Sequence, residues 1–385
     1  MTPAQPVHDV VVVGGGVIGL AVAWRAATEG LRVALVDPRP GSGATRVAAG
    51  MLAPVTEARY GEQPLLALAL ASARRYPSFA VELAEAAGRP AGYRQTGTLA
   101  VALDVDDRAA LRELHAVQTG LGLATDWLTG RECRTLEPLL APSVTGGLLA
   151  PGDHQVDNRV FAAALLAAAD RAGVDLWRVR ATGILCAGDR VIGVRLDDDG
   201  VLAAGQVVLA AGCWSAGLAG LPEPAVPPVR PVKGQILRLR TPPGQPYLGR
   251  AVRGTVRGGH VYLVPRPDGE LVVGATVEEQ GFDTRVTAGG VYELLRDAHD
   301  VLPGLTELTL VETAAGLRPG TPDNAPILGP APVPGLVYAT GHHRNGLLLT
   351  PVTADAVTAY LCTGTLPAVA APFTLDRFAH QEVPA

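Results

Sequence analysis

The sequence is poor in several residue types, and each shortage argues against a class of protein. Lysine occurs once, at Lys233, and no run of basic residues appears, so a nucleic-acid partner is not expected. The four cysteines among 385 residues are widely spaced and form neither a C-x-x-C pair nor a metal-ligand pattern. This spacing predicts reduced thiols in a cytoplasmic protein that binds no metal.

Long apolar runs are also missing. The longest uncharged stretch near the start, Val10–Trp24, holds three consecutive glycines and has no basic segment before it. We therefore expect neither a signal peptide nor a membrane span. Hydrophobic residues still make up 48% of the chain and charged residues 18%, which predicts a large core and two or three ordered domains.

The segment "HDVVVVGGGVIGL" carries the first motif. Its valines indicate a buried parallel strand, and the glycines that follow have the spacing G-x-G-x-x-G at Gly14, Gly16 and Gly19. In nucleotide-binding folds the first glycine permits a tight turn and the second lets backbone approach a pyrophosphate. The third lets the helix close onto the strand. Alone, this spacing is weak evidence.

The residues after the glycines make the motif specific. A helix is expected from Val17 to Thr28 and a second strand over Leu31–Val36, and Asp37 ends that strand. A carboxylate at this position accepts hydrogen bonds from ribose hydroxyls, and the start of the helix attracts phosphate. Strand, glycines, helix, strand and acid together predict a dinucleotide site, although this unit does not separate FAD from NAD.

The composition changes from segment to segment along the rest of the chain. Gly41–Pro54 is rich in small residues, and we expect irregular backbone wrapped around a ligand. From Pro227 the chain is rich in strands, and "RPDGEL" is expected to be a hairpin turn between His260–Val264 and Leu271–Gly274. Other helices are expected at Leu65–Gly88, Arg108–Leu121, Phe161–Ala172 and Gly290–Val301, and other strands at Thr96–Leu103, Asp175–Arg178, Val191–Leu196 and Val207–Ala210.

A strand, a glycine turn and a helix return at Gly335, which predicts a discontinuous nucleotide-binding domain. We expect an α/β fold, α+β overall, in which a Rossmann-like domain is combined with an antiparallel β-sheet substrate domain. The predicted boundaries are 1–90, 152–226 and 322–385 for the nucleotide-binding domain, and 91–151 and 227–321 for the substrate domain.

Several segments together resemble the FAD-dependent D-amino-acid oxidase family, which includes sarcosine oxidase. They are Gly14–Asp37, "AAGMLAP", "AAGCWS", "PVKGQ", "HVYLVPR", "VGAT", "GLRPGTPDNAPILG" and "GHHRNGLLL", and their order and spacing span nearly the whole chain. Within the family, the glycine oxidases of the thiamine-biosynthesis type are the most similar subgroup. The resemblance implies a D-amino-acid oxidase-like fold and noncovalent FAD rather than NAD.

The resemblance also implies which residues hold FAD. The dinucleotide motif would bind the adenosine half, Ala48–Met51 would line the flavin, and backbone near Ala181 would touch the adenine end. The turn at His343–Leu348 would face the pyrimidine edge of the flavin, where amide groups at a helix start stabilise negative charge. The expected contacts are Gly14, Gly15, Gly16, Val17, Ile18, Gly19, Asp37, Ala44, Thr45, Ala48, Ala49, Gly50, Met51, Ala181, Ala211, Gly212, Trp214, Arg318, His342, His343, Arg344, Asn345, Gly346, Leu347 and Leu348.

One cation, Arg318, stands in the rigid segment "GLRPGTPDNAPILG". A planar guanidinium forms two parallel hydrogen bonds with a carboxylate, and the family has its carboxylate-binding arginine here; the alternative is a structural ion pair. Tyr262 matches a tyrosine that donates its hydroxyl to the substrate carboxylate, and His260 shares its strand face. By the same resemblance, Arg344 lies near the substrate and Met51 forms an apolar wall.

The activity that the resemblance implies is oxidation of glycine, with sarcosine and small D-amino acids as further substrates. Hydride would pass from the substrate Cα to flavin N5, and water would hydrolyse the imine to a 2-oxo acid and ammonia. Dioxygen would be reduced to hydrogen peroxide. No protein acid or base is needed, so Arg318 and Tyr262 would act by positioning. Lys233 is expected to be structural rather than oxygen-activating.

Two alternatives stay open. One is a D-amino-acid dehydrogenase that passes electrons to an acceptor other than oxygen, and the other is a non-catalytic FAD-binding protein on the same fold. We expect no membrane partner. The resemblance implies a homo-oligomer, with a tetramer as the form seen among relatives.

Overall fold

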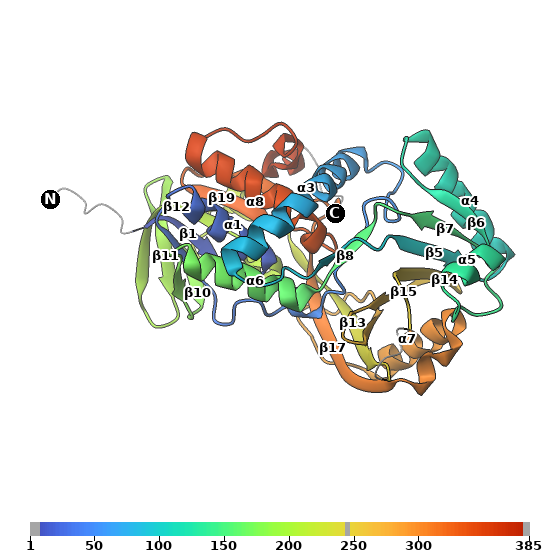
Figure 1. The fold of residues 1–385 in the computed structure, drawn as a ribbon. Helices are drawn as coiled ribbons and strands as arrows, with labels where there is room; N and C mark the ends of the chain where they lie inside the picture. Colours follow the sequence, from blue (N-terminus) through green and yellow to red (C-terminus); the bar gives the residue numbers. More distant parts are fainter. Residues whose placement is uncertain (1–7, 243–246, 380–385) are drawn as a thin grey trace.

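The computed structural model describes residues 8–242 and 247–379, which form two lobes, each built on an eight-stranded sheet (Figure 1). In the first sheet β1 (His8–Val13) is central, with β2 (Val33–Val36) and β12 (Val201–Leu209) parallel to it on either side. Successive valines of β1 enter cores on opposite faces of the sheet, as expected of a buried parallel strand. The other strands are β9 (Asp175–Trp177), β10 (Ala181–Ala187), β11 (Arg190–Leu196), β18 (Ile327–Pro330) and β19 (Leu336–Thr340).

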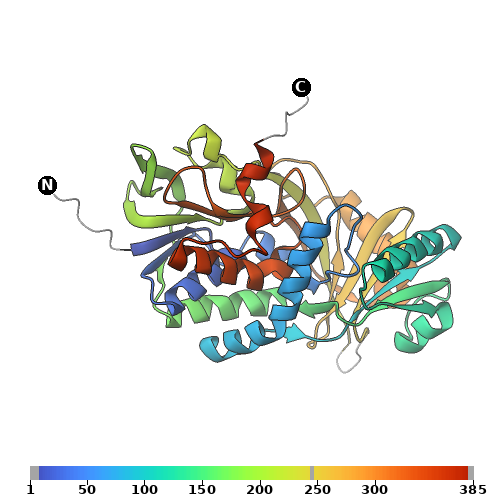
Figure 2. The same cartoon turned by 90° about the horizontal axis from the view of Figure 1, so that it is seen from above.

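A layer of helices covers one face of this sheet. α1 (Val17–Thr28) packs against α6 (Asn158–Arg171) and α8 (Gly346–Thr363), and α3 (Gln63–Ala87) crosses α6 and α8 (Figure 2). Elements from the beginning, middle and end of the chain therefore build the first lobe. Among the described residues, α8 is the one helix long and apolar enough to cross a membrane. However, 67% of it is buried inside the protein, as in a core helix.

The second sheet separates a packed core from a cavity-facing surface. Its pairs are antiparallel except the parallel pair of β14 and β5, and α7 (Ala288–Val301) packs on one face. The opposite face is turned toward the first lobe. The order across the sheet is β17 (Thr309–Gly320), β13 (Arg230–Arg240), β16 (Glu270–Gly274), β15 (Gly259–Pro265), β14 (Ala251–Val256), β5 (Thr98–Ala102), β7 (Gly146–Ala150) and β6 (Asp126–Thr129).

Smaller elements complete the two lobes. A three-stranded sheet joins β3 (Met51–Leu52), β8 (His154–Val156) and β4 (Tyr93–Arg94). The other helices are α2 (Ala44–Val47), α4 (Val105–Gly120) and α5 (Gly130–Leu136), and the 3-10 turns are Gly212–Gly217, Glu223–Ala225, Pro303–Glu307, Ala371–Phe373 and Leu375–Phe378.

Several predicted elements are confirmed, and the differences have local causes. The helix predicted over Val17–Thr28 has those bounds, and β15 and β16 form the predicted hairpin. α4 and α6 begin earlier than predicted because Asp104 and Asp157 accept hydrogen bonds from amides of the first turn. The Gly41–Pro54 segment, which was expected to be irregular, also contains the short elements α2 and β3.

Candidate active site

A cavity of about 1290 Å³ lies between the two lobes. Residues of the first lobe line it at the ends of β1 and β2, along α2 and at the start of α8. Residues of the second lobe line it from β14, β15 and β17. The cavity therefore joins the nucleotide motif to the free face of the second sheet.

The three motif glycines lie where β1 meets α1, and they serve different purposes. A Cβ on Gly14 would lie 2.4 Å from the Ala210 carbonyl oxygen, and one on Gly19 would lie 1.9 Å from the Gly14 carbonyl oxygen. These two glycines permit close packing, and Gly14 also has a φ of 107°. Gly16 instead lines the cavity at the N-cap of α1, where unpaired helix amides can bind a phosphate.

Asp37 directly follows β2 and lines the same part of the cavity. Its Oδ2 accepts a hydrogen bond from the Gly15 amide at 2.7 Å, and its Oδ1 accepts one from the Arg39 amide at 2.7 Å. These bonds fix the carboxylate. Because each oxygen has a further lone pair, Asp37 can still accept hydrogen bonds from ribose hydroxyls.

The segment from Ala44 to Met51 is held from behind by two buried side chains that the sequence did not single out. Asn158 Nδ2 donates to the Thr45 carbonyl at 2.7 Å, and Arg266 Nη2 donates to the Ala49 carbonyl at 2.6 Å. Burial lowers the pKa of Arg266 to about 10, so its charge persists at neutral pH. Both residues act on backbone distant in sequence, so no local pattern indicates them.

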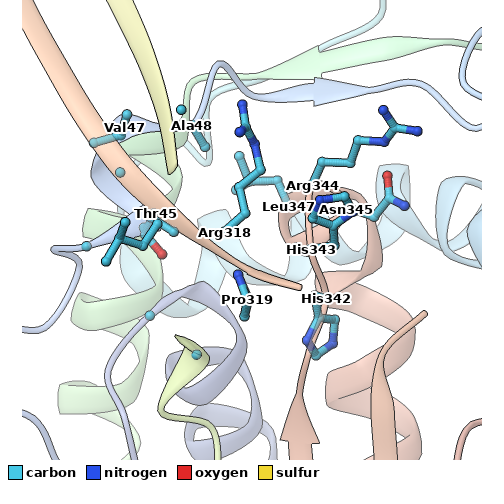
Figure 3. A pocket seen from close by; sticks show the side chains of 18 of the residues that line it. Thr45, Val47, Ala48, Arg318, Pro319, His342, His343, Arg344, Asn345 and Leu347 are labelled. Atoms are coloured by element: carbon cyan, nitrogen blue, oxygen red, sulfur yellow. The ribbon is translucent and has the colours of Figure 1, made fainter. Parts of the chain in front are cut away.

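The turn before α8 lies against β17 at the cavity. The His343 amide donates to the Pro319 carbonyl at 2.8 Å. Figure 3 shows Arg318 and Arg344 extending from these two neighbouring segments toward the same side of the pocket. The free amides at the start of α8 are thereby placed beside the cavity.

Both histidines of this turn are neutral at pH 7. His342 is buried, with its Nε2 3.0 Å from Thr353 Oγ1, and burial lowers the pKa of His342 to about 3. Burial, followed by the charges of nearby arginines, lowers the pKa of His343 to about 4. Within residues 8–242 and 247–379, no three His, Cys, Asp or Glu side chains are grouped as a metal site.

Arg318 projects from β17 over Gly234 of β13. Its Nη1 donates to the carbonyls of Lys233 and Thr276, each at 3.2 Å. A Cβ on Gly234 would lie 2.4 Å from the Arg318 Nη2, so glycine is needed to make room for the guanidinium. No carboxylate of the described residues forms an ion pair with Arg318, which excludes a structural ion pair within that part of the chain.

Tyr262 stands beside Arg318 on the same face of the sheet. Gly274 of β16 is the cross-strand partner of Tyr262, and a Cβ on Gly274 would lie 2.5 Å from the Tyr262 hydroxyl. The tyrosine ring therefore occupies the space above that glycine. Burial raises the pKa of Tyr262, and the charges of Arg318 and Arg253 oppose this only in part. The hydroxyl is therefore protonated at neutral pH and can donate a hydrogen bond. His260 also lines the cavity, as its alternation with Tyr262 predicts.

The end of the cavity that holds Arg318 and Tyr262 is here called the substrate end. It contains two charged residues, Glu57 and Arg253, that the sequence did not predict. Glu57 pairs with Arg253 of β14 and, at 3.3 Å, with Arg344. Burial raises the pKa of Glu57, but the charges of Arg253 and Arg344 outweigh this, so its pKa lies below its usual value. Met51 Sδ lies 3.9 Å from the Arg253 Nη1. Predicted residues and newly found ones therefore share this end of the cavity.

Lys233 faces away from the cavity. Its side chain is buried, and its Nζ lies 3.2 Å from Glu278 Oε2. It does not line the cavity, and its carbonyl supports Arg318. The surroundings of Lys233 are therefore those of a structural residue rather than of a residue that faces the cavity.

Most of the remaining predicted FAD contacts line the cavity. Gly15, Gly19 and Leu348 do not: Gly15 abuts Asp37 and Pro40, Gly19 abuts Gly14, and the Leu348 carbonyl accepts from Ser72. Trp214 lies at the rim, 49% exposed, and stacks on Phe282. The others in the lining are Val17, Ile18, Ala44, Thr45, Ala48, Ala49, Gly50, Ala181, Ala211, Gly212, Asn345, Gly346 and Leu347.

The sequence profile of the family described as "DAO: FAD dependent oxidoreductase" matches residues 9–360. The chain belongs to this family. Glycine oxidase from Geobacillus kaustophilus is 37% identical over 374 residues, which cover 96% of this chain and 97% of that protein. A crystal structure of glycine oxidase from that species has a TM-score of 0.89 at 35% identity, covering 99% of this chain and 100% of the other.

Other relatives of the chain bear different names. Hydrogen cyanide synthase subunit HcnC of Pseudomonas aeruginosa is 34% identical over 407 residues, which cover 96% of each chain. The bifunctional protein ThiO/ThiG of Trichormus variabilis is 34% identical over 376 residues, covering 97% of this chain but 56% of that protein. The chain thus spans about half the length of the bifunctional relatives it matches.

The site fits the cofactor of the DAO family. Gly16 at the start of α1 and Asp37 at the end of β2 suit the two halves of an adenosine diphosphate. The Nδ1 of His343 is buried and has no partner among the described residues, so it is available to a group bound in the cavity. FAD is the cofactor, and the protein is an FAD-dependent oxidoreductase.

Proposed function

We propose that the protein is a glycine oxidase that also accepts sarcosine and small D-amino acids. The observation that carries this proposal is Arg318, a cation without a protein carboxylate among the described residues, held at the cavity over Gly234. Arg318 is half-buried, and a substrate carboxylate supplies the anion that a partly desolvated guanidinium favours. The likeness to glycine oxidase over nearly the whole of both chains supports the choice of substrate.

Arg318 and Tyr262 orient the substrate. The guanidinium binds the carboxylate through two charge-assisted hydrogen bonds, and the protonated Tyr262 hydroxyl donates another. Fixing the carboxylate fixes Cα, the carbon that loses hydride. Because two backbone carbonyls hold Arg318 beforehand, little orientation entropy is lost when the substrate binds.

The charges around the cavity keep the substrate amine neutral. Arg253, Arg318 and Arg344 line the substrate end of the cavity, and Glu57 is the carboxylate that pairs with Arg253 and Arg344. A positive environment disfavours ammonium, so it lowers the pKa of the bound amine. The neutral amine has the lone pair that stabilises the developing iminium, so these residues prepare the substrate without acting as a base.

Bound FAD supplies a two-electron acceptor for the hydride. The amides at the start of α8 stabilise negative charge beside the cavity. The overall reaction balances as glycine, dioxygen and water giving glyoxylate, ammonia and hydrogen peroxide. Dioxygen as the acceptor, a cytoplasmic location and a homo-oligomer, as a tetramer, belong to this proposal.

The proposal is tested by measuring hydrogen peroxide from the purified holoenzyme with glycine, sarcosine and D-alanine. Each should yield peroxide and a 2-oxo acid, with glycine or sarcosine preferred. Silence on all three substrates would overturn the proposal. If flavin bleaches without oxygen but air yields little peroxide, the protein is instead a dehydrogenase that uses another acceptor. If no amine bleaches the flavin, the non-catalytic alternative holds.

A second candidate is a subunit of a cyanide-forming enzyme, because HcnC matches over almost its full length. It is distinguished by product analysis of glycine turnover. Glyoxylate and ammonia in equal amounts support the oxidase, whereas hydrogen cyanide supports the second candidate.

A further inference from the structure

Two backbone carbonyls hold the Arg318 guanidinium, and both belong to residues of a small polar network in the second sheet. The Arg318 Nη1 donates to the carbonyls of Lys233 and Thr276, each at 3.2 Å. These two bonds set the plane of the guanidinium, and that plane decides how its remaining N–H groups meet a carboxylate. The position of Arg318 is therefore only as precise as the positions of the Lys233 and Thr276 carbonyls.

The side chains of Lys233 and Gln235 project to the face of β13 that lies opposite Arg318. Side chains alternate along a strand, and Gly234 between them faces the cavity beneath the guanidinium. Neither Lys233 nor Gln235 lines the cavity, and each is 1% exposed. Gln235 instead binds Thr287 at the start of α7, where its Oε1 accepts a hydrogen bond from the Thr287 amide at 2.9 Å. These side chains can therefore act on Arg318 only through the backbone.

Thr276 lies outside the regular ladder of the sheet, because β16 ends at Gly274. The Thr276 amide donates to the Gln235 carbonyl at 3.3 Å, and the Thr276 Oγ1 accepts from the Gln235 amide at 2.9 Å. Two residues further on, the backbone of Glu278 exchanges two hydrogen bonds with that of Lys233. The side chain of Thr276 thus helps to hold a segment that the ladder does not.

The Glu278 carboxylate joins Lys233, Gln235 and Thr276 to one another. Its Oε1 accepts hydrogen bonds from the Gln235 Nε2 at 2.7 Å and from the Thr276 hydroxyl, and its Oε2 lies 3.2 Å from the Lys233 Nζ. Burial raises the pKa of Glu278, but hydrogen bonds from Thr276, Gln235 and Lys233 outweigh burial, so the pKa lies below its usual value. Glu278 is therefore ionised at neutral pH and binds three donors at once.

An apolar pair could hold the sheet together as well as the ion pair of Lys233 and Glu278. The Lys233 side chain is 1% exposed and that of Glu278 is 23% exposed. Taking both charges out of water is costly, and apolar residues of similar volume are often as stable in such a place. An ion pair has directional hydrogen bonds that an apolar pair lacks. Its distinct effect here is therefore on geometry, because it fixes where the Lys233 and Thr276 carbonyls point.

We propose that Glu278, with Lys233 as its partner, is a positioning residue for substrate binding that acts through Arg318. The Glu278 carboxylate holds the residues whose carbonyls fix the guanidinium, so it sets how Arg318 receives the substrate carboxylate. This rests on the proposed function, in which Arg318 binds that carboxylate. The single lysine of the sequence then serves the substrate site although its side chain does not line the cavity.

The paired variant Lys233→Met/Glu278→Leu tests the proposal, because it removes both charges and leaves neither partner buried alone. We expect kcat/KM for glycine to fall about tenfold, since a displaced guanidinium meets the substrate carboxylate poorly. The dissociation constant of glycolate, measured by perturbation of the flavin spectrum, should rise by a similar factor. Glu279→Gln is the matched control, because Glu279 is the next residue and pairs at the surface with Arg230 of β13.

A double-mutant cycle with Arg318→Ala separates positioning from general destabilisation. If Glu278 acts through Arg318, the paired change should alter kcat/KM for glycine less than about twofold once Arg318 is removed. An equal loss in both backgrounds would mean a merely structural role and would overturn the proposal.

The flavin-to-protein absorbance ratio shows whether each variant has folded. If the paired variant does not retain flavin, Glu278→Gln takes its place in the same cycle. This variant keeps the shape of the side chain and removes its charge, so we expect a loss in kcat/KM of about threefold that disappears in the Arg318→Ala background. A loss that persists in that background would again overturn the proposal.

The outcomes distinguish this proposal from the proposed function. Oxidation of glycine that the paired variant carries out at the wild-type kcat/KM overturns the positioning role and keeps the oxidase. If no amine is oxidised, crystal structures of the FAD-bound wild type and variant decide the matter without turnover. An Arg318 guanidinium displaced from the two carbonyls in the variant supports the proposal, and one that still binds both overturns it.

Discussion

The two ends of the cavity are built in opposite ways. At the nucleotide end, Gly14, Gly16 and Asp37 come from one continuous stretch of strand, turn, helix and strand. At the substrate end, Arg318 and Tyr262 come from separate strands, and glycines on two further strands make room for them. The first end is encoded locally, whereas the second exists only once the strands pair in register.

This difference has a physical consequence for the two ends. The nucleotide end is made of backbone amides and one carboxylate on rigid elements, so single side-chain changes should weaken it moderately. The substrate end depends on a few charged side chains with defined room, so a single change there should have a large effect. The predictions below test this contrast, beginning with the largest expected effect.

Arg318→Ala should lower kcat/KM for glycine about 100- to 1,000-fold, because it removes the cation that holds the substrate carboxylate. Flavin content should stay at the wild-type level, since the nucleotide end is untouched. Steady-state kinetics and the flavin-to-protein absorbance ratio measure both. Arg195→Ala, at an exposed arginine of β11, is the control. Loss of flavin together with activity would show that the two ends are not separable.

Gly234→Ala should lower kcat/KM about 100-fold although it removes no functional group, because its Cβ would displace the Arg318 guanidinium from a position 2.4 Å away. The matched control is Gly289→Ala in α7, where a Cβ meets nothing within 4 Å. Normal activity in Gly234→Ala would mean that the position of Arg318 does not matter.

Asp37→Ala should weaken FAD binding about 10- to 100-fold, because hydrogen bonds to a charged acceptor are lost at the ribose. The dissociation constant, measured by quenching of flavin fluorescence, should rise, while KM for glycine at saturating FAD should hold. Asp189→Ala, in the exposed turn after β10, serves as the control. A change in KM without a change in FAD affinity would reverse the assignment of the two ends.

His342→Asn should flatten the loss of stability on acidification. The pKa of His342 is about 3 in the folded protein, below its unfolded value, so the unfolded chain binds more protons as pH falls through 6.5. Between pH 7 and 5 this costs the wild type about 2 kcal/mol, which the variant should avoid. Thermal unfolding at both pH values, with His299→Asn as the exposed control, measures the difference. Equal slopes in wild type and variant would mean that His342 does not titrate as its burial demands.

The nucleotide end of the cavity can be predicted from the sequence more fully than the substrate end. The helix at Val17–Thr28 and the acid at Asp37 are local patterns, and their positions follow from spacing alone. The expectation for Arg318 and Tyr262 depends on the family resemblance, because nothing adjacent to either residue indicates the other. The structure adds Gly234 and Gly274, whose need to be glycine arises only from the side chains lying over them.

Glu57 and Arg253 escape sequence reasoning for a related reason. Glu57 and Arg253 lie far apart in the chain, in segments of different composition. The register of β14 with β15 brings Arg253 beside Tyr262. Asn158 and Arg266 likewise support the Ala44–Met51 segment although they lie 113 and 217 residues along the chain from the carbonyls that they bind. A charged residue in a strand does not indicate its partner until the fold is known.

The most direct test of the account is a crystal structure of the FAD-bound protein with a small carboxylate inhibitor such as glycolate. We predict that its carboxylate lies between the Arg318 guanidinium and the Tyr262 hydroxyl, on the cavity side of Gly234, with the flavin beside Met51. A carboxylate bound elsewhere in the cavity, with Arg318 turned toward a protein acid, would contradict the account.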